Sequence, residues 1–381
     1  MALTLIWGFG ITGESVANFL HQQQASFIIF DDNQVSAQKA RLQFGEKRVV
    51  TKLPDLDLIK QVIVSPGISC WDHRYQQIAR LGIPIKTDIE LFLSLFKGKV
   101  IAVTGTNGKS TLVAMLAHIA KKLGLKSMAI GNIGKPCLQV DLTCDLVVLE
   151  LSSFHLAHMQ DSANIDISIM LALTPDHLDW HKSYNHYQFS KQKIKNAKRN
   201  YTVINNSIFD AYGNMQAANY NQEFLIMLIA KALSWYRPDV MQAISSFKAL
   251  PHRQQQFYWA GRSWVNDSKA TNAAATLYAL NCFNKASVLI LAGLNKGWAD
   301  EQITNNLKAI IVVGNIKDWP INTCDITVYE VLSVELAINL AYKITADGET
   351  ILFAPGGSSF DHYQNYAARG DYFMDQVKCI S

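Results

Sequence analysis

The chain alternates short apolar runs with stretches in which apolar residues recur at helical spacing. The runs are rich in Val, Ile and Leu, which is typical of strands buried on both faces of a parallel sheet. Helical stretches between such strands indicate crossover connections, and therefore an α/β fold. The strands predicted in this way are 2–7, 27–30, 62–64, 84–86, 100–103, 145–149, 165–173, 203–205, 264–266, 286–292, 310–313 and 350–353.

The most informative stretch, Thr104-Gly-Thr-Asn-Gly-Lys-Ser-Thr111, lies between the strand 100–103 and a predicted helix. Its glycines let the backbone approach an anion, and the helix start offers N–H groups and a positive dipole end. Lys109 can reach the β- and γ-phosphates of a nucleotide, and the Ser110 hydroxyl can bind Mg²⁺. The usual phosphate loop has a glycine where this chain has Val103, and an ordinary Gly-rich turn is the alternative.

A second Gly-rich turn, Gly8-Phe-Gly-Ile-Thr-Gly13, follows the first predicted strand. Asp31-Asp32 ends the next strand about twenty residues further on, which completes the Rossmann pattern. Taken alone the pattern suggests NAD, although any nucleotide diphosphate can bind on such a turn. Thr87 and Glu90 form a capping box that begins a helix, and the first domain is predicted to end close to this point.

Polar side chains follow two of the strands predicted after the phosphate loop. Glu150 ends the strand 145–149, where a carboxylate can hold Mg²⁺, and an exposed strand end is the alternative. Strand 165–173 runs into Asp176-His-Leu-Asp-Trp-His181, at the edge where doubly wound sheets bind ligands. A zinc site there is conceivable but lacks a second group of ligands, and a surface histidine is an equal alternative for His181.

Composition narrows the class of protein. The 381 residues are 49% hydrophobic and carry a net charge of only +4, which argues against a dedicated nucleic-acid surface. Basic residues concentrate at 191–199, where a solvated helix face explains most of them. The six cysteines have no metal-binding spacing, so a reduced cytosolic protein is expected. The N-terminus leaves no room for a signal peptide, and the apolar stretch 224–235 is too short to span a membrane.

The remaining pattern divides the chain further. Residues 206–222 are polar and lack a clear period, and Pro251-His-Arg253 marks a second boundary. Alternation of strands and helices then resumes, which indicates another parallel sheet. We therefore predict three α/β domains, at 1–92, 93–249 and 250–381. The first and third are Rossmann-like, and the central one has a parallel sheet of the phosphate-loop ATPase type.

Five motifs together resemble the Mur ligases of peptidoglycan synthesis: Thr104–Thr111, Gly131-Asn-Ile-Gly134, Glu150-Leu-Ser-Ser-Phe154, Asp176-His-Leu-Asp179 and Pro251-His-Arg253. Asn266-Asp-Ser-Lys-Ala-Thr-Asn272 is similar to the D-glutamate-adding members, and 355–370 supports that choice. The resemblance implies ATP-dependent addition of D-glutamate to UDP-N-acetylmuramoyl-L-alanine through an acyl phosphate, with two Mg²⁺ ions. It also implies a bacterial cytoplasmic enzyme, which we expect to be a monomer without nucleic-acid or membrane partners.

The resemblance also implies roles for individual residues. The catalytic residues would be Lys109, Glu150, His177 and Lys191. Magnesium would be held by Ser110, Glu150, His177 and Lys191, the last as a carbamate formed with CO₂. ATP would be bound by Gly105, Thr106, Asn107, Gly108, Lys109, Ser110, Thr111, Asn221, Arg253 and Asp267. The UDP-substrate would contact Ile11, Thr12, Asp31, Asp32, Gly67 and Asn132. D-Glutamate would contact Lys269, Thr271, Lys296, Ser359 and Tyr366.

The chain departs from the family pattern at three places. Leu294 stands where the family usually has Asp, and an asparagine expected near the adenine corresponds to Phe224. Region 206–222 is much shorter than in typical members of the family, so we expect strands at the edge of the central sheet to be absent. Two alternatives remain: a related amide ligase, such as a folylpolyglutamate synthase or another Mur ligase, and a homologue that binds a UDP-sugar without turnover. The 266–272 stretch weighs against the first, and Lys109, Glu150, His177 and Lys191 weigh against the second.

Overall fold

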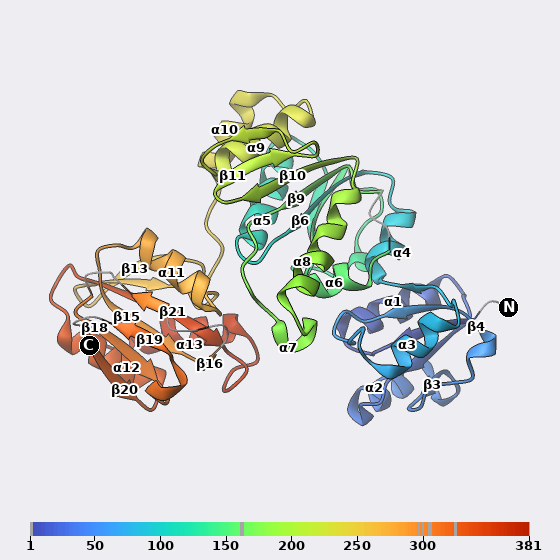
Figure 1. Ribbon diagram of the computed structural model, residues 1–381, viewed down its shortest axis with the longest axis horizontal. Coiled ribbons are helices and arrows are strands. Elements are labelled where there is room, and N and C mark those ends of the chain that lie inside the picture. Colours follow the sequence, from blue (N-terminus) through green and yellow to red (C-terminus); the bar gives the residue numbers. More distant parts are fainter. Residues whose placement is uncertain are drawn as a thin grey trace. The chain divides into compact units, whose positions relative to one another are not determined.

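The computed structural model describes residues 3–160, 164–295, 298, 301–303, 307–323 and 326–380. It contains three main sheets, which confirms the predicted α/β class (Figure 1). By its internal contacts the chain divides into two compact units, residues 1–247 with the first two sheets and residues 248–381 with the third. The exact domain boundaries stay predictions. Within the described ranges, no helix is both long and apolar enough to cross a membrane.

The first sheet is parallel and has the order β3-β2-β1-β4-β5. Apolar residues on its two faces pack against α1 and α2 on one side and against α3 on the other. The strand order reverses between β1 and β4, so the loops that follow these strands form the crevice in which such sheets bind ligands. The elements are β1 (Leu3–Trp7), α1 (Ile11–Gln22), β2 (Phe27–Phe30), α2 (Gln34–Phe44), β3 (Val49–Val50), β4 (Ile59–Val64), α3 (His73–Arg80), β5 (Ile85–Lys86) and α4 (Asp88–Leu95).

The central sheet has the order β12-β11-β10-β9-β6-β8-β7, with β6 to β10 parallel. Helices α5, α9 and α10 pack on one face, and α4 and α6 on the other. The elements are β6 (Lys99–Thr104), α5 (Lys109–Lys122), β7 (Ser127–Gly131), β8 (Leu146–Glu150), α6 (Ser153–His158), β9 (Ile167–Met170), α7 (Leu178–His181), α8 (Tyr184–Gln192), β10 (Arg199–Ile204), β11 (Ser207–Asp210), β12 (Met215–Ala217), α9 (Gln222–Ala232) and α10 (Arg237–Ser245).

The expectation that 206–222 lacks strands is wrong. Strands β11 and β12 in this region extend the sheet edge, because β11 pairs antiparallel with β10 and β12 pairs antiparallel with β11. The Asp210 carboxylate accepts hydrogen bonds from the backbone N–H groups of Tyr212 and Asn214, both at 2.9 Å, and Gly213 has a positive φ of 79°. These interactions form a tight turn between β11 and β12 and set the pairing of the two strands. Both strands are too short for an alternation of apolar and polar residues to be recognised in the sequence.

The third sheet has the order β13-β14-β21-β15-β18-β20, and β16 pairs with β21 beside this order. The pairs β13–β14 and β16–β21 are antiparallel, and the other described pairs are parallel. Helix α11 packs on one face, and α12 and α13 on the other. The elements of this unit are β13 (Gln255–Trp259), β14 (Arg262–Asn266), α11 (Ala273–Cys282), β15 (Ala286–Ala292), β16 (Leu294–Asn295), β17 (Glu301–Ile303), β18 (Ala309–Val313), β19 (Ile321–Thr323), β20 (Thr327–Val331), α12 (Val334–Ile344), β21 (Thr350–Ser358) and α13 (Tyr366–Lys378). Strands β17 and β19 form a separate two-stranded parallel sheet.

Candidate active site

The phosphate loop connects β6 to α5 at the carboxyl edge of the central sheet. Gly105 and Gly108 have φ angles of 148° and 81°, which side chains other than glycine rarely adopt, and a Cβ on Gly105 would overlap Leu171. The first turn of α5 has no side-chain cap, so its N–H groups face the loop. The Lys109 ammonium donates to the carbonyls of Gly105 (2.9 Å) and Thr106 (2.8 Å). The local geometry is therefore that of an anion-binding loop with a lysine folded over it.

Glu150 lies beside this loop, because β8 pairs with β6 in a register that places Glu150 opposite Val103. Its side chain is only 1% exposed, so the alternative of an exposed strand end is wrong. One carboxylate oxygen, Oε1, accepts from Asn132 Nδ2 at 3.0 Å. The other, Oε2, is buried and has no hydrogen-bond partner in the part of the chain that the structure describes. A buried carboxylate oxygen of this kind needs a polar or charged partner, which a water molecule or a cation can supply.

Lys191 is buried to 2% exposure on α8, so it does not belong to the solvated face of the basic stretch. Its ammonium donates to Thr104 Oγ1 at 3.1 Å and to the Gly105 carbonyl at 2.9 Å. It also lies 5.0 Å from the ring centre of Tyr187, one turn earlier on the same helix. Burial, followed by the nearby Lys109 charge, lowers the pKa of Lys191 well below its ordinary value. The structure thus brings Lys191 directly to the phosphate loop.

His177 precedes α7 with a φ of 54°, in the left-handed region that histidine adopts more often than most residues with side chains. Its imidazole packs edge-on against Phe154, with ring centres 4.7 Å apart, and its Nε2 lies 3.6 Å from Asp176 Oδ2. His181, in contrast, is fully buried, so the surface alternative for it is wrong. Burial also lowers the pKa of His181 to about 4, so its side chain is neutral at physiological pH.

Tyr187 links these elements, and it was not among the predicted site residues. Its hydroxyl lies 2.7 Å from Thr106 Oγ1, which is also bonded to the backbone N–H and carbonyl of Thr174. The phosphate loop, the loop that leads to His177 and the helix that carries Lys191 are therefore joined by hydrogen bonds. The signal in the sequence was the spacing of four residues between Tyr187 and Lys191, which places both side chains on one helix face.

The residues fit magnesium better than zinc. The described parts of the chain contain no group of three or more His, Cys, Asp or Glu side chains placed to hold a metal ion. Zinc sites need such groups, whereas Mg²⁺ binds through one or two protein oxygens together with phosphates and water. Glu150 offers a buried oxygen for this purpose, and the Ser110 hydroxyl lies at the start of α5. Their pairing with His177 and Lys191 around magnesium stays a prediction.

The predicted UDP site lies at the start of α1 in the first domain. Asp31 is nearly buried and accepts from the backbone N–H groups of Phe9 (2.6 Å) and Asn33 (2.9 Å), so it stabilises the Gly-rich turn. Asp32 is more exposed and pairs with Arg74 at 2.8 Å. Ile11 is 78% exposed at the uncapped helix start, next to Thr12. This surface offers N–H groups for a phosphate and an apolar side chain for a base or sugar.

Two further residues of the predicted UDP-substrate site lie on other loops of the first unit. The Gly67 carbonyl follows β4 and is within 3.4 Å of Trp180 Nε1 on α7. Asn132 follows β7 and donates its amide to Glu150, so a contact with substrate would compete with this bond or use its carbonyl oxygen.

Asn221 caps α9 by accepting from the backbone N–H of Glu223 at 2.8 Å. Its predicted contact with ATP is not tested by this arrangement.

In the second unit, the predicted residues follow the carboxyl ends of β14 and β21. Burial raises the pKa of Asp267 to about 6, and its Oδ1 accepts from the N–H of Gln254 at 3.3 Å, one residue after Arg253. The Lys269 ammonium lies 4.7 Å from the ring centre of Tyr366. Thr271 belongs to the same loop as Lys269, and Ser359 follows β21. Lys296 lies outside the described residues.

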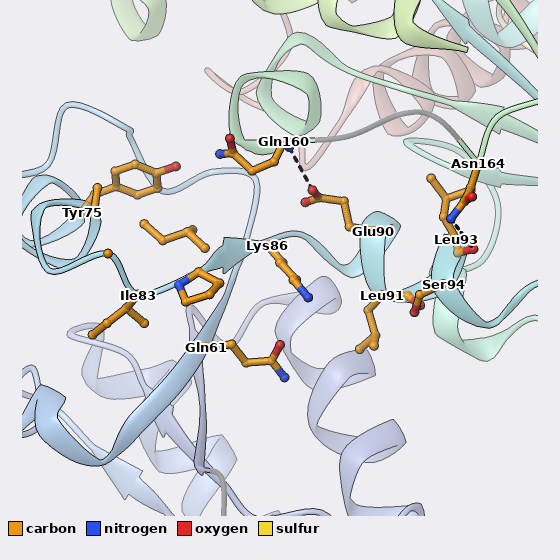
Figure 2. Close-up of a pocket in the computed structure, with 14 residues that line it drawn as sticks. Gln61, Tyr75, Ile83, Lys86, Glu90, Leu91, Leu93, Ser94, Gln160 and Asn164 are labelled. Atoms are coloured by element: carbon orange, nitrogen blue, oxygen red, sulfur yellow. Dashed lines mark hydrogen bonds between the residues drawn. The ribbon is translucent and has the colours of Figure 1, made fainter. Parts of the chain in front are cut away.

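A surface pocket of about 680 Å³ lies elsewhere in the first unit, between α3, β5 and α4 (Figure 2). The Glu90 side chain at its rim accepts from the N–H groups of Thr87 and Gln160, both at 2.9 Å. Its lining includes none of the predicted site residues. We therefore place the candidate active site at the phosphate loop and not in this pocket.

Comparison with known proteins shows which family the chain resembles. Residues 103–245 match the Mur ligase middle domain, and residues 2–87 match the N-terminal domain of MurD-like Mur ligases. A UDP-N-acetylmuramoylalanine--D-glutamate ligase from Pseudothermotoga lettingae is 31% identical, over 90% of this chain and 89% of its own. The chain belongs to the Mur ligase family. A ligase of the same name from Francisella philomiragia is also 31% identical, over 98% of this chain and 96% of its own.

Solved structures share the fold of this Mur ligase. MurF from Thermotoga maritima, in complex with ADP, superposes with a TM-score of 0.55 at 14% identity, covering 98% of this chain and 94% of that one. A pseudomurein peptide ligase type C from Methanothermus fervidus gives a TM-score of 0.54 at 16% identity, over 99% and 100% of the two chains. At such identities the likeness shows the three-domain fold alone, and that fold confirms the predicted architecture.

Three departures from expected patterns have distinct structural settings: Val103 departs from the usual phosphate loop, and Leu294 and Phe224 depart from the family pattern. Val103 is fully buried in β6, which ends at Thr104. The position that holds glycine in the usual phosphate loop therefore belongs to the strand in this chain. Leu294 is 56% exposed in β16 and pairs with Ser358 of β21. Phe224 is 40% exposed on the first turn of α9. Leu294 and Phe224 therefore place apolar side chains on the protein surface, whereas Val103 is part of the hydrophobic core.

Proposed function

We propose that the protein is an ATP-dependent ligase that joins D-glutamate to UDP-N-acetylmuramoyl-L-alanine in peptidoglycan synthesis. Relatives that carry this name match it over most of its length. The observation that carries the proposal is the juxtaposition of a phosphate loop, a buried carboxylate with an unpartnered oxygen and a buried lysine on one sheet edge. A protein that only bound a nucleotide sugar would not require this combination.

The reaction follows from these groups. A carboxylate oxygen of the L-alanine end attacks the γ-phosphorus of ATP, ADP leaves, and an acyl phosphate forms. The amine of D-glutamate then attacks the acyl carbon, and the tetrahedral intermediate expels phosphate to form the amide. The loop N–H groups and Lys109 bind the phosphates and stabilise the charge of the phosphoryl group during its transfer. Arg253, Asp267 and Asn221 are proposed to hold the remainder of ATP.

Magnesium fits the residues at this edge. Bound Mg²⁺ would offset negative charge between the nucleotide, the carboxylate and the acyl phosphate. Ser110 and Glu150 are proposed to hold one ion, with Asn132 orienting the Glu150 carboxylate so that Oε2 faces the ligand. His177 and Lys191 are proposed to hold the other. An ammonium is a poor ligand for a hard cation, so Lys191 would serve as a carbamate, which supplies two oxygens.

The two ends of the substrates are assigned to the outer domains. Ile11, Thr12, Asp31, Asp32 and Gly67 are proposed to bind the UDP end at the start of α1. Lys269, Thr271, Lys296, Ser359 and Tyr366 are proposed to orient D-glutamate in the third domain. We further propose that the enzyme acts in the bacterial cytoplasm as a monomer. The five described cysteines are free thiols, as expected for a reducing compartment.

We expect D-glutamate, but not L-glutamate, to stimulate phosphate release from ATP in the presence of UDP-N-acetylmuramoyl-L-alanine. Polar groups that match one enantiomer are left unpaired by the other, which rejects it by a factor of about 10³ or more. The assay compares D-glutamate, L-glutamate, L-alanine and a diamino acid at equal concentration. Equal stimulation by both enantiomers, or preference for another amino acid, would assign the protein to a different amide ligase. Absence of turnover with every amino acid would favour a binding protein.

The substitution Phe224→Asn should lower the KM for ATP about fivefold, since one added hydrogen bond contributes roughly 1 kcal/mol. The reason is that Phe224 occupies the place of an asparagine expected at the adenine, and it is partly exposed. Such a contact binds ground and transition states alike, so kcat should stay constant. Tyr212→Asn, at a 90% exposed turn of the same domain, is the control. An unchanged or higher KM for Phe224→Asn would contradict the assignment of this surface to adenine.

A further inference from the structure

The Arg369 guanidinium is completely buried in the third domain, on the second turn of α13. Its Nε donates to Ser268 Oγ at 3.1 Å, and its Nη2 donates to the Ser268 carbonyl at 2.9 Å. Its Nη1 donates to the carbonyls of Gly357 (3.0 Å) and Ala292 (3.3 Å). One planar side chain thus bonds to three separate segments of the backbone.

These three segments are the carboxyl ends of neighbouring parallel strands. Ser268 follows β14, Ala292 ends β15, and Gly357 lies near the end of β21. Each segment leads directly into residues that we propose for D-glutamate, namely Lys269 and Thr271, Lys296, and Ser359. Ser268 Oγ also donates to the carbonyl of Tyr366, the first residue of α13. The described residues of this proposed site, Lys269, Thr271, Ser359 and Tyr366, therefore lie close in the chain to backbone that bonds to Arg369 directly or through Ser268.

Two glycines in the backbone around the guanidinium leave space for this side chain. Gly293 has a φ of 96°, and a Cβ there would come within 2.7 Å of Arg369 Nη1. A Cβ on Gly357 would meet the Ala292 carbonyl oxygen at 2.7 Å. The two glycines thus let the chain ends approach each other and the guanidinium together.

Stability alone does not explain a cation in this position. No carboxylate within the described ranges forms an ion pair with Arg369, and burial lowers the pKa of its guanidinium to about 10, so it is charged at neutral pH. Replacing buried charges by apolar groups of similar volume is often neutral or stabilising. A rigid fork of five donors, in contrast, fixes the positions of several acceptors at once.

We propose that Arg369 is a positioning residue that sets the mutual placement of the loops around D-glutamate and thereby the affinity for the amino acid. This inference rests on the proposed function. Arg369 has no exposed surface and so does not touch the substrate itself. Its effect should therefore appear in the amino-acid step and not in the binding of the two other substrates.

The test compares Arg369→Lys with the parent enzyme in the phosphate-release assay, with each of the three substrates varied in turn. A lysine keeps the charge but cannot reach three segments, so we expect the KM for D-glutamate to rise about tenfold or more. The KM values for ATP and for UDP-N-acetylmuramoyl-L-alanine should stay within about twofold of the parent values. Ser268→Ala removes one acceptor and should raise the D-glutamate KM by a smaller factor, even if Arg369→Lys fails to fold.

Arg262→Lys is the matched control, because Arg262 lies on the same strand β14 and bonds to the Thr345 carbonyl at 2.7 Å, away from these loops. It should leave all three KM values unchanged. A D-glutamate KM that stays constant in both test variants, or a common rise of all three KM values, would overturn the inference. Failure of D-glutamate to stimulate the parent enzyme would instead overturn the proposed function, and the inference with it.

Discussion

Replacing Lys109 with alanine should reduce ATP turnover by about 10³-fold, because the variant loses the loop cation that stabilises the transferring phosphoryl group. The Lys109 ammonium lies against the loop carbonyls of Gly105 and Thr106, within the same few residues that would surround the phosphates. The first domain does not include this loop, so binding of the UDP-substrate should be nearly unchanged. Phosphate release and calorimetric binding of UDP-N-acetylmuramoyl-L-alanine measure the two effects separately.

Lys122→Ala is the control for this experiment. Lys122 lies on the last turn of the same helix, α5, and is exposed to solvent. Its removal should change phosphate release by less than about twofold, since a surface charge contributes little. If the Lys109→Ala variant turned over ATP at the parental rate, the assignment of this loop to phosphate binding would be wrong. An equal loss in both variants would show that helix α5, and not the Lys109 charge, is responsible.

The parts of the fold that the sequence predicts are those with a strong local pattern. The run 100–103 is buried in β6, and the glycines at 105 and 108 adopt the positive φ angles that a phosphate loop requires. Such features depend on residues close together in the chain, so periodicity and glycine spacing are sufficient to find them. The strongly apolar strands of the three sheets were predictable for the same reason, whereas β7, β11, β12 and β13 were not among the predicted strands.

Burial of single polar residues could not be predicted in this way. Lys191 lies among five basic residues in 191–199, yet it is enclosed by Thr104 and Gly105, which are more than eighty positions earlier. Arg369 is similar, because its acceptors come from segments far apart in the chain. The strand β9 is also shorter than predicted, at Ile167–Met170, because residues 171–177 leave the sheet toward the site. Tertiary pairing decides these features, and no local pattern records it.

Replacing Lys191 with alanine should remove most of the ligase activity, by about 10²-fold or more if the side chain supplies magnesium ligands. Carbamylation joins the neutral amine nitrogen to the carbon of CO₂. The ammonium loses one proton before this step and the amine loses a second one in it, so the side-chain charge changes from +1 to −1 with release of two protons. Nζ is already held by two acceptors at the loop, and the remaining N–H of a carbamate can keep one of these bonds. Its two oxygens would then be available to a cation beside His177.

Three measurements distinguish this role from that of a buried structural lysine. Acetate should restore part of the activity of Lys191→Ala, since a small carboxylate can occupy the space that the side chain leaves. The parent enzyme should lose activity in CO₂-depleted buffer and regain it with bicarbonate, and ¹³C-bicarbonate should produce a carbamate signal in the NMR spectrum of the protein. Lys198→Ala is the control, because Lys198 is exposed and pairs with Asp166 at 3.1 Å. A folded Lys191→Ala protein with full activity would show that Lys191 is not a magnesium ligand, and Glu150, Ser110 and water would then hold the ion. An inactive variant that acetate does not rescue, in a protein that gives no carbamate signal, would make Lys191 a structural residue of the phosphate loop.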